Sequence, residues 1–241
     1  MTEITTVNHE LELKAVFTFL EGAYQKTDKF VLADKVENAS RASSPKVKAE
    51  LRRMIFQHFW DNERMPSPLV VFFNKVSDYP SRQQVILLEL VKRNKLFCEF
   101  AIASREVLSA NWVNVKERLR NVEPRLSEAA LKKYYAKFVS SLRELDFVFK
   151  TSHGNKVIPV EPTPAAFAFG IYTIYSKVSP IVDMQAVASE RLLKAALWTE
   201  EGRLKAIRQG DGKFFVLEEK PPLHRLVLKY SSLEDFVTRG L

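Results

Sequence analysis

Lysines and arginines on two predicted helices are the residues of this sequence best suited to bind a ligand. The helix predicted from Ser127 and the helix predicted from Ser44 each carry four basic residues beside an apolar stripe. Such a helix lays its polar face in the major groove of DNA while the stripe anchors it to the domain. Its first backbone amides can also receive a phosphate, because the helix dipole favours negative charge there. The predicted DNA contacts are Lys46, Lys48, Arg52, Arg53, Lys116, Arg118, Arg120, Ser127, Lys132, Lys133, Lys137, Lys150 and Lys156.

The kind of basic residue indicates how selective this binding is. Three of the four basic residues on the Ser127 helix are lysines, which act as point charges for phosphate, whereas arginine and Asn/Gln read bases through paired hydrogen bonds. The composition therefore favours low sequence specificity. Lys150 and Lys156 flank the tip of a predicted hairpin, where they are placed to straddle a sugar–phosphate backbone. The same pattern also fits ordinary solvated helix faces, on which lysine and arginine are common.

The whole chain shares this positive bias. It has 37 Lys and Arg against 29 Asp and Glu, a net charge of +8 and a pI near 9.5. Each phosphate that such a protein neutralises releases condensed counterions, which favours association with polyanions.

Signatures of catalysis and of metal binding are missing from the sequence. Seven glycines form no phosphate-binding loop, and four histidines stand far apart without ligand spacing. Cys98 is the single cysteine and lies among apolar residues, a setting that predicts a buried, unreactive thiol. We therefore expect no enzyme activity, no catalytic residue, no metal and no cofactor.

Nothing in the sequence points to a membrane. The longest uncharged stretch, 162–176, is shorter than the ~20 residues that span a bilayer and contains two prolines. The start of the chain has no basic and apolar pattern of a signal peptide. We expect a cytoplasmic protein.

Apolar periodicity predicts a mainly α protein, a compact helical bundle with winged helix-turn-helix-like segments and one or two short β-hairpins. We divide it into an N-terminal basic helical domain, a central helical core, a winged-helix-like segment and a C-terminal helical segment with a hairpin, which together can pack as one unit. These parts cover residues 1–64, 65–110, 111–162 and 163–241.

The segment 111–160 has the most informative order of elements. A short helix at 113–121, a turn, a helix at 128–145 and a hairpin at 147–160 follow one another, as in a winged helix-turn-helix. Farther on, we expect a single helix at 183–198, a second hairpin around 214–230, and a final helix whose start has capping-box spacing at Ser231 and Glu234.

Several stretches of the sequence together resemble a known family. They are LSEAALKK at 126–133 running on to LRELDFV at 142–148, SSPKVKAELRR at 43–53, and VILLELVKR at 85–93 followed by 97–108. These stretches resemble the BrxA family of bacteriophage-exclusion (BREX) defence systems. The order of these stretches matches over most of residues 10–160. The resemblance implies a small, mainly α-helical DNA-binding component of an anti-phage system, without catalytic residues.

Three interpretations remain open besides double-stranded DNA as the partner. The chain can be an adaptor that docks a larger enzyme or other proteins of the defence locus, a helical RNA-binding protein, or an enzyme without recognisable motifs. As partners we expect neither a membrane nor a small-molecule substrate.

Overall fold

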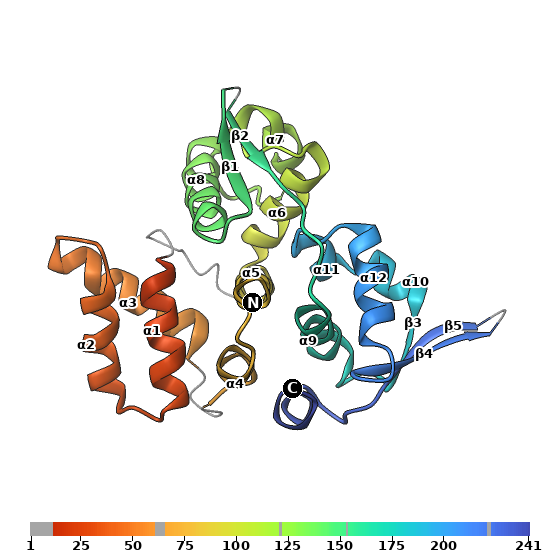
Figure 1. Cartoon of the computed structure of the whole chain (residues 1–241). Coiled ribbons are helices and arrows are strands. Elements are labelled where there is room, and N and C mark those ends of the chain that lie inside the picture. Colours follow the sequence, from red (N-terminus) through yellow and green to blue (C-terminus); the bar gives the residue numbers. More distant parts are fainter. Residues whose placement is uncertain (1–11, 61–65, 121, 153, 221–222) are drawn as a thin grey trace.

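The protein is mainly helical, as the sequence predicts, and carries two small antiparallel sheets. The computed structural model describes residues 12–60, 66–120, 122–152, 154–220 and 223–241. Three groups of elements surround a central pair of helices (Figure 1).

The N-terminal group is made of α1 (Leu13–Tyr24), α2 (Lys29–Ala39) and α3 (Pro45–Phe59). Asp28 caps the start of α2, and its carboxylate accepts the backbone N–H of Phe30 at 2.9 Å. Pro45 occupies the first position of α3, as predicted, because its missing N–H would have no partner there. Ser44 stands at the predicted N-cap position, but its side chain accepts no capping hydrogen bond, so the expected cap is only half correct.

The centre is formed by α4 (Pro68–Lys75) and α5 (Tyr79–Arg93). α5 is buried along most of its length, polar residues included. The Gln83 amide donates to the Asp146 carboxylate at 2.8 Å. Gln84 donates to the Glu161 carbonyl at 3.0 Å and accepts the Thr163 N–H at 2.9 Å. α5 therefore holds two segments that lie about 60 and 80 residues farther along the chain.

The third group contains α6 (Lys95–Val107), α7 (Trp112–Leu119), α8 (Glu128–Glu144), β1 (Val148–Thr151) and β2 (Gly154–Val157). The predicted hairpin is present, with β1 and β2 antiparallel. Residues 108–110 run beside the other edge of β2: Ala110 donates to the Asn155 carbonyl at 2.9 Å, and Ser109 forms a β-bridge with Lys156.

The C-terminal group forms a three-stranded sheet and the helices that cover it. Its elements are α9 (Pro164–Tyr175), β3 (Ile181–Asp183), α10 (Met184–Ser189), α11 (Arg191–Ala195), α12 (Glu200–Gly210), β4 (Phe215–Lys220), β5 (Leu223–Leu228), α13 (Leu233–Asp235) and the π-helix η1 (Phe236–Gly240). The strands lie in the order β3-β5-β4. Tyr172 of α9 is fully buried and its hydroxyl donates to the carbonyl of Phe214, the residue before β4, at 2.6 Å, which ties α9 to the start of the hairpin.

The last two groups repeat one order of elements. We call residues 95–157 the first hairpin unit and residues 164–228 the second hairpin unit. Each runs helix, short extended segment, helices, hairpin. In each, the extended segment lies beside the second strand of the hairpin: 108–110 beside β2, and β3 beside β5.

Two sequence predictions for the C-terminal group are wrong. The single helix expected at 183–198 is instead the end of β3 followed by two short helices, because Asp183 and Glu190 each accept backbone N–H groups and start a new helix. The final helix is capped one residue later than expected: Ser232 accepts the Asp235 N–H at 3.0 Å, so Ser231 and Glu234 are not the capping pair.

His58, near the end of α3, makes the stability of the fold depend on pH. Burial, and then the charge of Arg93 on α5, lower the pKa of His58 from 6.5 to about 4. In the unfolded chain His58 is therefore protonated below about pH 6.5, whereas in the folded protein it stays neutral until the pH is near 4. The contribution of neutral His58 to the free energy of unfolding is fully present above pH 6.5. It is lost as the pH falls from 6.5 toward 4. We expect this difference in protonation to lower the free energy of unfolding by about 2 kcal/mol between about pH 7 and pH 5, measured by urea denaturation.

The variant His58→Leu removes the titrating group and provides the control. Between about pH 7 and pH 5 its free energy of unfolding should fall by about 2 kcal/mol less than that of the unmodified protein. An identical pH dependence in the two proteins would mean that folding does not lower the pKa of His58.

Candidate nucleic-acid interface

α8 turns one side to the domain and the other to solvent. Ser127 caps it as predicted, since its hydroxyl accepts the Ala130 N–H at 3.2 Å. Tyr135 and Phe138 are buried on the inner side, and the Tyr135 hydroxyl is hydrogen-bonded to Ser104 of α6 at 2.8 Å. These contacts fix which residues α8 presents outward.

The outward side of α8, which we call the α8 surface, combines small residues with two rows of cations. At 100° per residue, Lys133 and Lys137 fall on one flank of the helix, and Lys132 and Arg143 on the other. Between the flanks lie Ala129, Ala136 and Ser140, the two alanines being exposed. Short side chains in the middle let the helix backbone come close to another molecule, while the flanking cations reach past them on both sides.

Two lysines of the α8 surface keep an exposed charge. Within the described part of the chain, Lys132 and Lys133 are exposed and make no ion pair. Burial, and then repulsion from Lys133, lower the pKa of Lys137, while the Glu50 carboxylate on α3 opposes this shift. Glu128 stands in the first turn of α8, where its negative charge interacts favourably with the helix dipole. The same charge repels a phosphate, so the first amides of α8 are a poor phosphate site.

The hairpin places its two lysines on opposite faces. Lys150 lies opposite Asn155, and Lys156 lies opposite Phe149 in the β1–β2 register. Side chains of a strand alternate, so Lys150 shares a face with Asn155, which accepts a hydrogen bond from Arg143 of α8 at 3.1 Å. Lys150 therefore extends the α8 surface, whereas Lys156 belongs to the other face of the hairpin.

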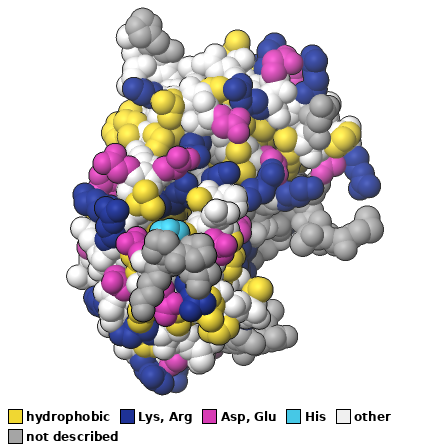
Figure 2. All heavy atoms as spheres, turned by 90° about the vertical axis from the view of Figure 1, so that its right-hand side faces the viewer, with side chains coloured by type: hydrophobic (Ala, Val, Ile, Leu, Met, Phe, Trp, Pro, Cys, Tyr) yellow, Lys and Arg dark blue, Asp and Glu magenta, His cyan; other side chains and the backbone are white. Residues whose placement is uncertain are grey.

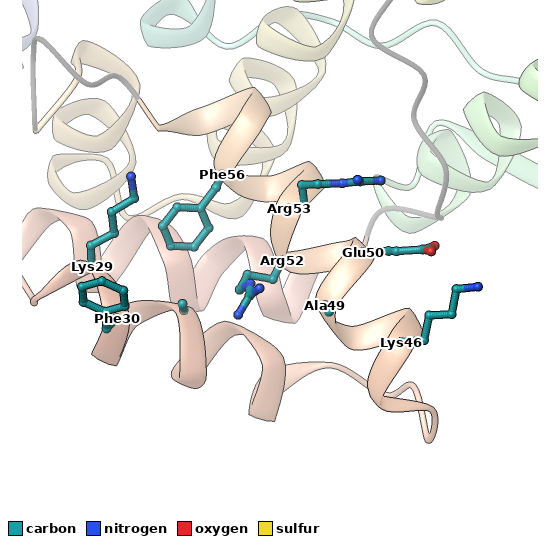
Figure 3. A pocket seen from close by; sticks show the side chains of 9 residues that line it. Lys29, Phe30, Lys46, Ala49, Glu50, Arg52, Arg53 and Phe56 are labelled. Atoms are coloured by element: carbon teal, nitrogen blue, oxygen red, sulfur yellow. The ribbon is translucent and has the colours of Figure 1, made fainter.

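On α3 the basic residues separate into two sets. Arg52 turns toward α2 and pairs with Glu37 at 2.8 Å, while Lys46, Glu50 and Arg53 extend along the other side of α3 (Figure 3). Lys48 is half-buried. Arg53 and Lys46 are exposed and make no ion pair among the described residues. Of the predicted contacts on this helix, these two keep an unneutralised charge at the surface.

α3 and α8 lie close enough to act on one ligand. Arg41, just before α3, pairs with Glu144 in the last turn of α8 at 2.6 Å. The charge of Glu50 on α3 acts on Lys137 of α8. The flank of α8 that carries Lys133 and Lys137 therefore faces α3.

The predicted contacts on α7 are less suited to phosphate. Arg118 pairs with Glu106 at 2.9 Å and Arg120 with Glu117 at 3.5 Å, so each arginine already has a carboxylate partner. Lys116 is half-buried. The structure does not join these residues to the α8 surface.

Arg143 is a residue of this surface that the sequence-based list omits. Helical spacing alone places Arg143 beside Lys132. Its hydrogen bond to Asn155 in the hairpin, which the sequence does not reveal, ties this flank of α8 to β2.

Among the residues that the structure describes, the second hairpin unit carries no matching surface. α12, which corresponds by order to α8, begins with Glu200 and Glu201. Lys205 pairs with Glu161 at 2.6 Å, and Arg225 pairs with Glu218 at 2.6 Å. Figure 2 shows the C-terminal side of the molecule, with acidic, basic and hydrophobic side chains intermixed. The concentration of cations is therefore a property of the first unit.

Among the described residues, no group of three or more His, Cys, Asp or Glu is placed to hold a metal ion. Burial, and then the charge of Glu99, raise the pKa of the Cys98 thiol, which makes it a weaker nucleophile. Across the part of the chain that the structure describes, no helix has both the length and the apolar character needed to cross a bilayer.

Comparisons with protein-family models, with curated proteins and with solved structures find no match for this chain. The interface is therefore defined by its own geometry.

The ion pair of Arg52 predicts that two adjacent arginines contribute unequally to DNA binding. Arg53→Gln should weaken binding of a short duplex several-fold at low salt, because it removes an exposed charge beside α8. Arg52→Gln should change the affinity little, since Glu37 already neutralises that charge. Fluorescence anisotropy with a labelled duplex measures both. Equal losses would contradict the division of α3 into two sets.

Proposed function

We propose that this protein binds double-stranded DNA through the α8 surface, mainly by phosphate contacts and with low sequence specificity. The observation that carries the proposal is the arrangement of Lys132 and Arg143 on one flank of exposed Ala129 and Ala136, with Lys133 and Lys137 on the other. A helix that enters a major groove meets a phosphate backbone on each side, and this arrangement offers cations to both.

The first hairpin unit, in our proposal, is a winged helix-turn-helix. Support comes from its order of elements and from the strand-like segment 108–110 beside β2. In that architecture α7 and α8 are the helix-turn-helix pair, α8 is the recognition helix, and the β1–β2 hairpin is the wing. Lys150 is then the lysine of the wing that lies on the same side as α8.

Low specificity follows from the chemistry of the α8 surface. Lysines and small side chains dominate it, and neither supplies the paired hydrogen bonds by which arginine, asparagine or glutamine identifies a base. Phosphate contacts orient a protein on the duplex without reading its sequence.

The biological setting of the proposal is bacterial anti-phage defence. The resemblance to the BrxA family supports a non-enzymatic component of a BREX system in the cytoplasm, and the stretches that carry it include α8 and α3.

A second candidate, an adaptor that docks a larger defence enzyme, is favoured by the groove between α2 and α3. RNA binding is a further alternative, and competition between RNA and DNA duplexes distinguishes it, because the deep, narrow major groove of A-form RNA does not admit a helix.

The decisive experiment measures duplex affinity as a function of salt. Replacing Lys132, Lys133 and Lys137 together by glutamine should weaken binding strongly and lower the slope of log K against log[salt] by about 2–3, since each phosphate contact contributes about 0.9. RNA duplex should compete poorly. Unchanged affinity and slope would remove α8 as the contact.

A charge introduced in the middle of the α8 surface provides a matched control for net charge. Ala136→Glu places a carboxylate between the cation rows, and Val178→Glu adds the same charge at an exposed site of the second hairpin unit. The first variant should lose most duplex binding and the second should keep it. Similar losses in both would show that only the overall charge matters.

A further inference from the structure

A groove between α2 and α3 adjoins the α8 surface: Lys46 and Arg53, two of the predicted DNA contacts, also stand on its rim. It encloses about 600 Å³, within the range of ligand-binding sites in proteins. Its apolar lining comes from Phe30 and Ala33 of α2 and from Ala49 and Phe56 of α3. Figure 3 shows Phe30 and Phe56 on either side of the opening.

Phe30 is exposed to an unusual degree for an aromatic residue. Its side chain is 81% accessible, and Val31 next to it is 49% accessible. Neither is needed in the core, because α2 packs through Leu32 and Val36. A large apolar side chain held in water at the edge of a groove is typical of a surface that a partner covers.

The charges around the groove are mostly positive. Among the described residues, Lys29, Lys46, Arg52 and Arg53 line it together with one carboxylate, that of Glu50. Glu37 neutralises Arg52, and the Lys29 ammonium lies 5.1 Å from the centre of the Trp60 ring. An occupant must therefore combine apolar side chains for the floor with acidic groups for the rim.

We propose that this groove docks an acidic amphipathic helix of a partner protein. A groove between two helices accepts a third helix that inserts side chains spaced at i, i+3, i+4 and i+7. Acidic residues on the flanks of that helix meet the cations of the rim. A second copy of this chain suits the groove poorly, because its net charge of +8 opposes self-association.

The experiment uses a labelled peptide of about 15 residues with leucines at that spacing and glutamates elsewhere, long enough to form an isolated helix. Fluorescence anisotropy should show saturable binding to the full chain. A counterpart peptide with lysine in place of each glutamate should bind far more weakly. Failure of the glutamate peptide to bind, or equal binding of both peptides, overturns the proposal.

Variants of α2 locate the bound peptide. Phe30→Ala should weaken binding by at least about tenfold, the loss typical of a truncated anchor residue. Lys29→Glu should weaken it in a salt-dependent way. Val31→Ala and Lys35→Glu change the same helix at exposed positions outside the groove lining and should have little effect. Loss of binding in the controls, or none in Phe30→Ala, contradicts the site.

Further outcomes separate this site from the other possible occupants and from the proposed function. The glutamine variant of Lys132, Lys133 and Lys137 should keep peptide binding, and Phe30→Ala should keep duplex binding, so either proposal can fail without the other. Displacement of the peptide by single-stranded DNA in a Phe30-dependent way would make the groove a nucleic-acid site. Self-association that Phe30→Ala abolishes would make it an interface between copies. Both results overturn the proposal.

Discussion

Burial of α5 on all sides is the constraint on which the arrangement of this molecule depends. A helix in the middle of a protein must satisfy its polar side chains with protein partners, because an unpaired buried amide costs about 1–3 kcal/mol. Gln83 and Gln84 find theirs in the turn after α8 and in the segment before α9. Glu89, also buried, pairs with Lys92 and Arg93 on the same helix. The hydrogen bonds that α5 requires therefore set the positions of both hairpin units.

The α8 surface follows from this placement. The bond from Gln83 to Asp146 holds the residue at which the chain turns from α8 into β1, where Asp146 has a positive φ of 61°. The turn sets the hairpin beside α8, and Arg143 and Asn155 meet there. On the other flank, the Arg41–Glu144 pair keeps α3 near α8. Cations from separate segments thus come to lie around one helix.

The two hairpin units share an order of elements but differ in surface chemistry. α8 exposes Ala136 between lysines, whereas α12 exposes Leu204 behind a glutamate-rich first turn. Topology therefore does not by itself imply a shared ligand, and function has to be argued for each surface separately.

Helix starts with a strong local signal could be predicted from the sequence. Pro45 and Ser127 mark the first turns of α3 and α8, and the predicted bounds of α8, 128–145, agree with the structure to within a residue. The break of 183–198 into β3, α10 and α11 was missed, because it depends on pairing of β3 with the distant β5 and on Glu190 acting as a cap.

The candidate site was predicted only in part for the same physical reason. Exposed lysines of α8 follow from helical periodicity, but neutralisation of Arg52 by Glu37 and of Arg118 by Glu106 is a contact between different elements. Likewise, the opposite faces of Lys150 and Lys156 follow from a strand register that no local pattern sets.

Lysine acetylation with and without duplex DNA, read by mass spectrometry, tests the central claim most directly. The account predicts that a bound duplex protects Lys132, Lys133 and Lys150 from the reagent. Lys35 on α2 and Lys177 after α9, both exposed, should react at unchanged rates. Protection of Lys35 or Lys177 while the lysines of α8 remain reactive would contradict it.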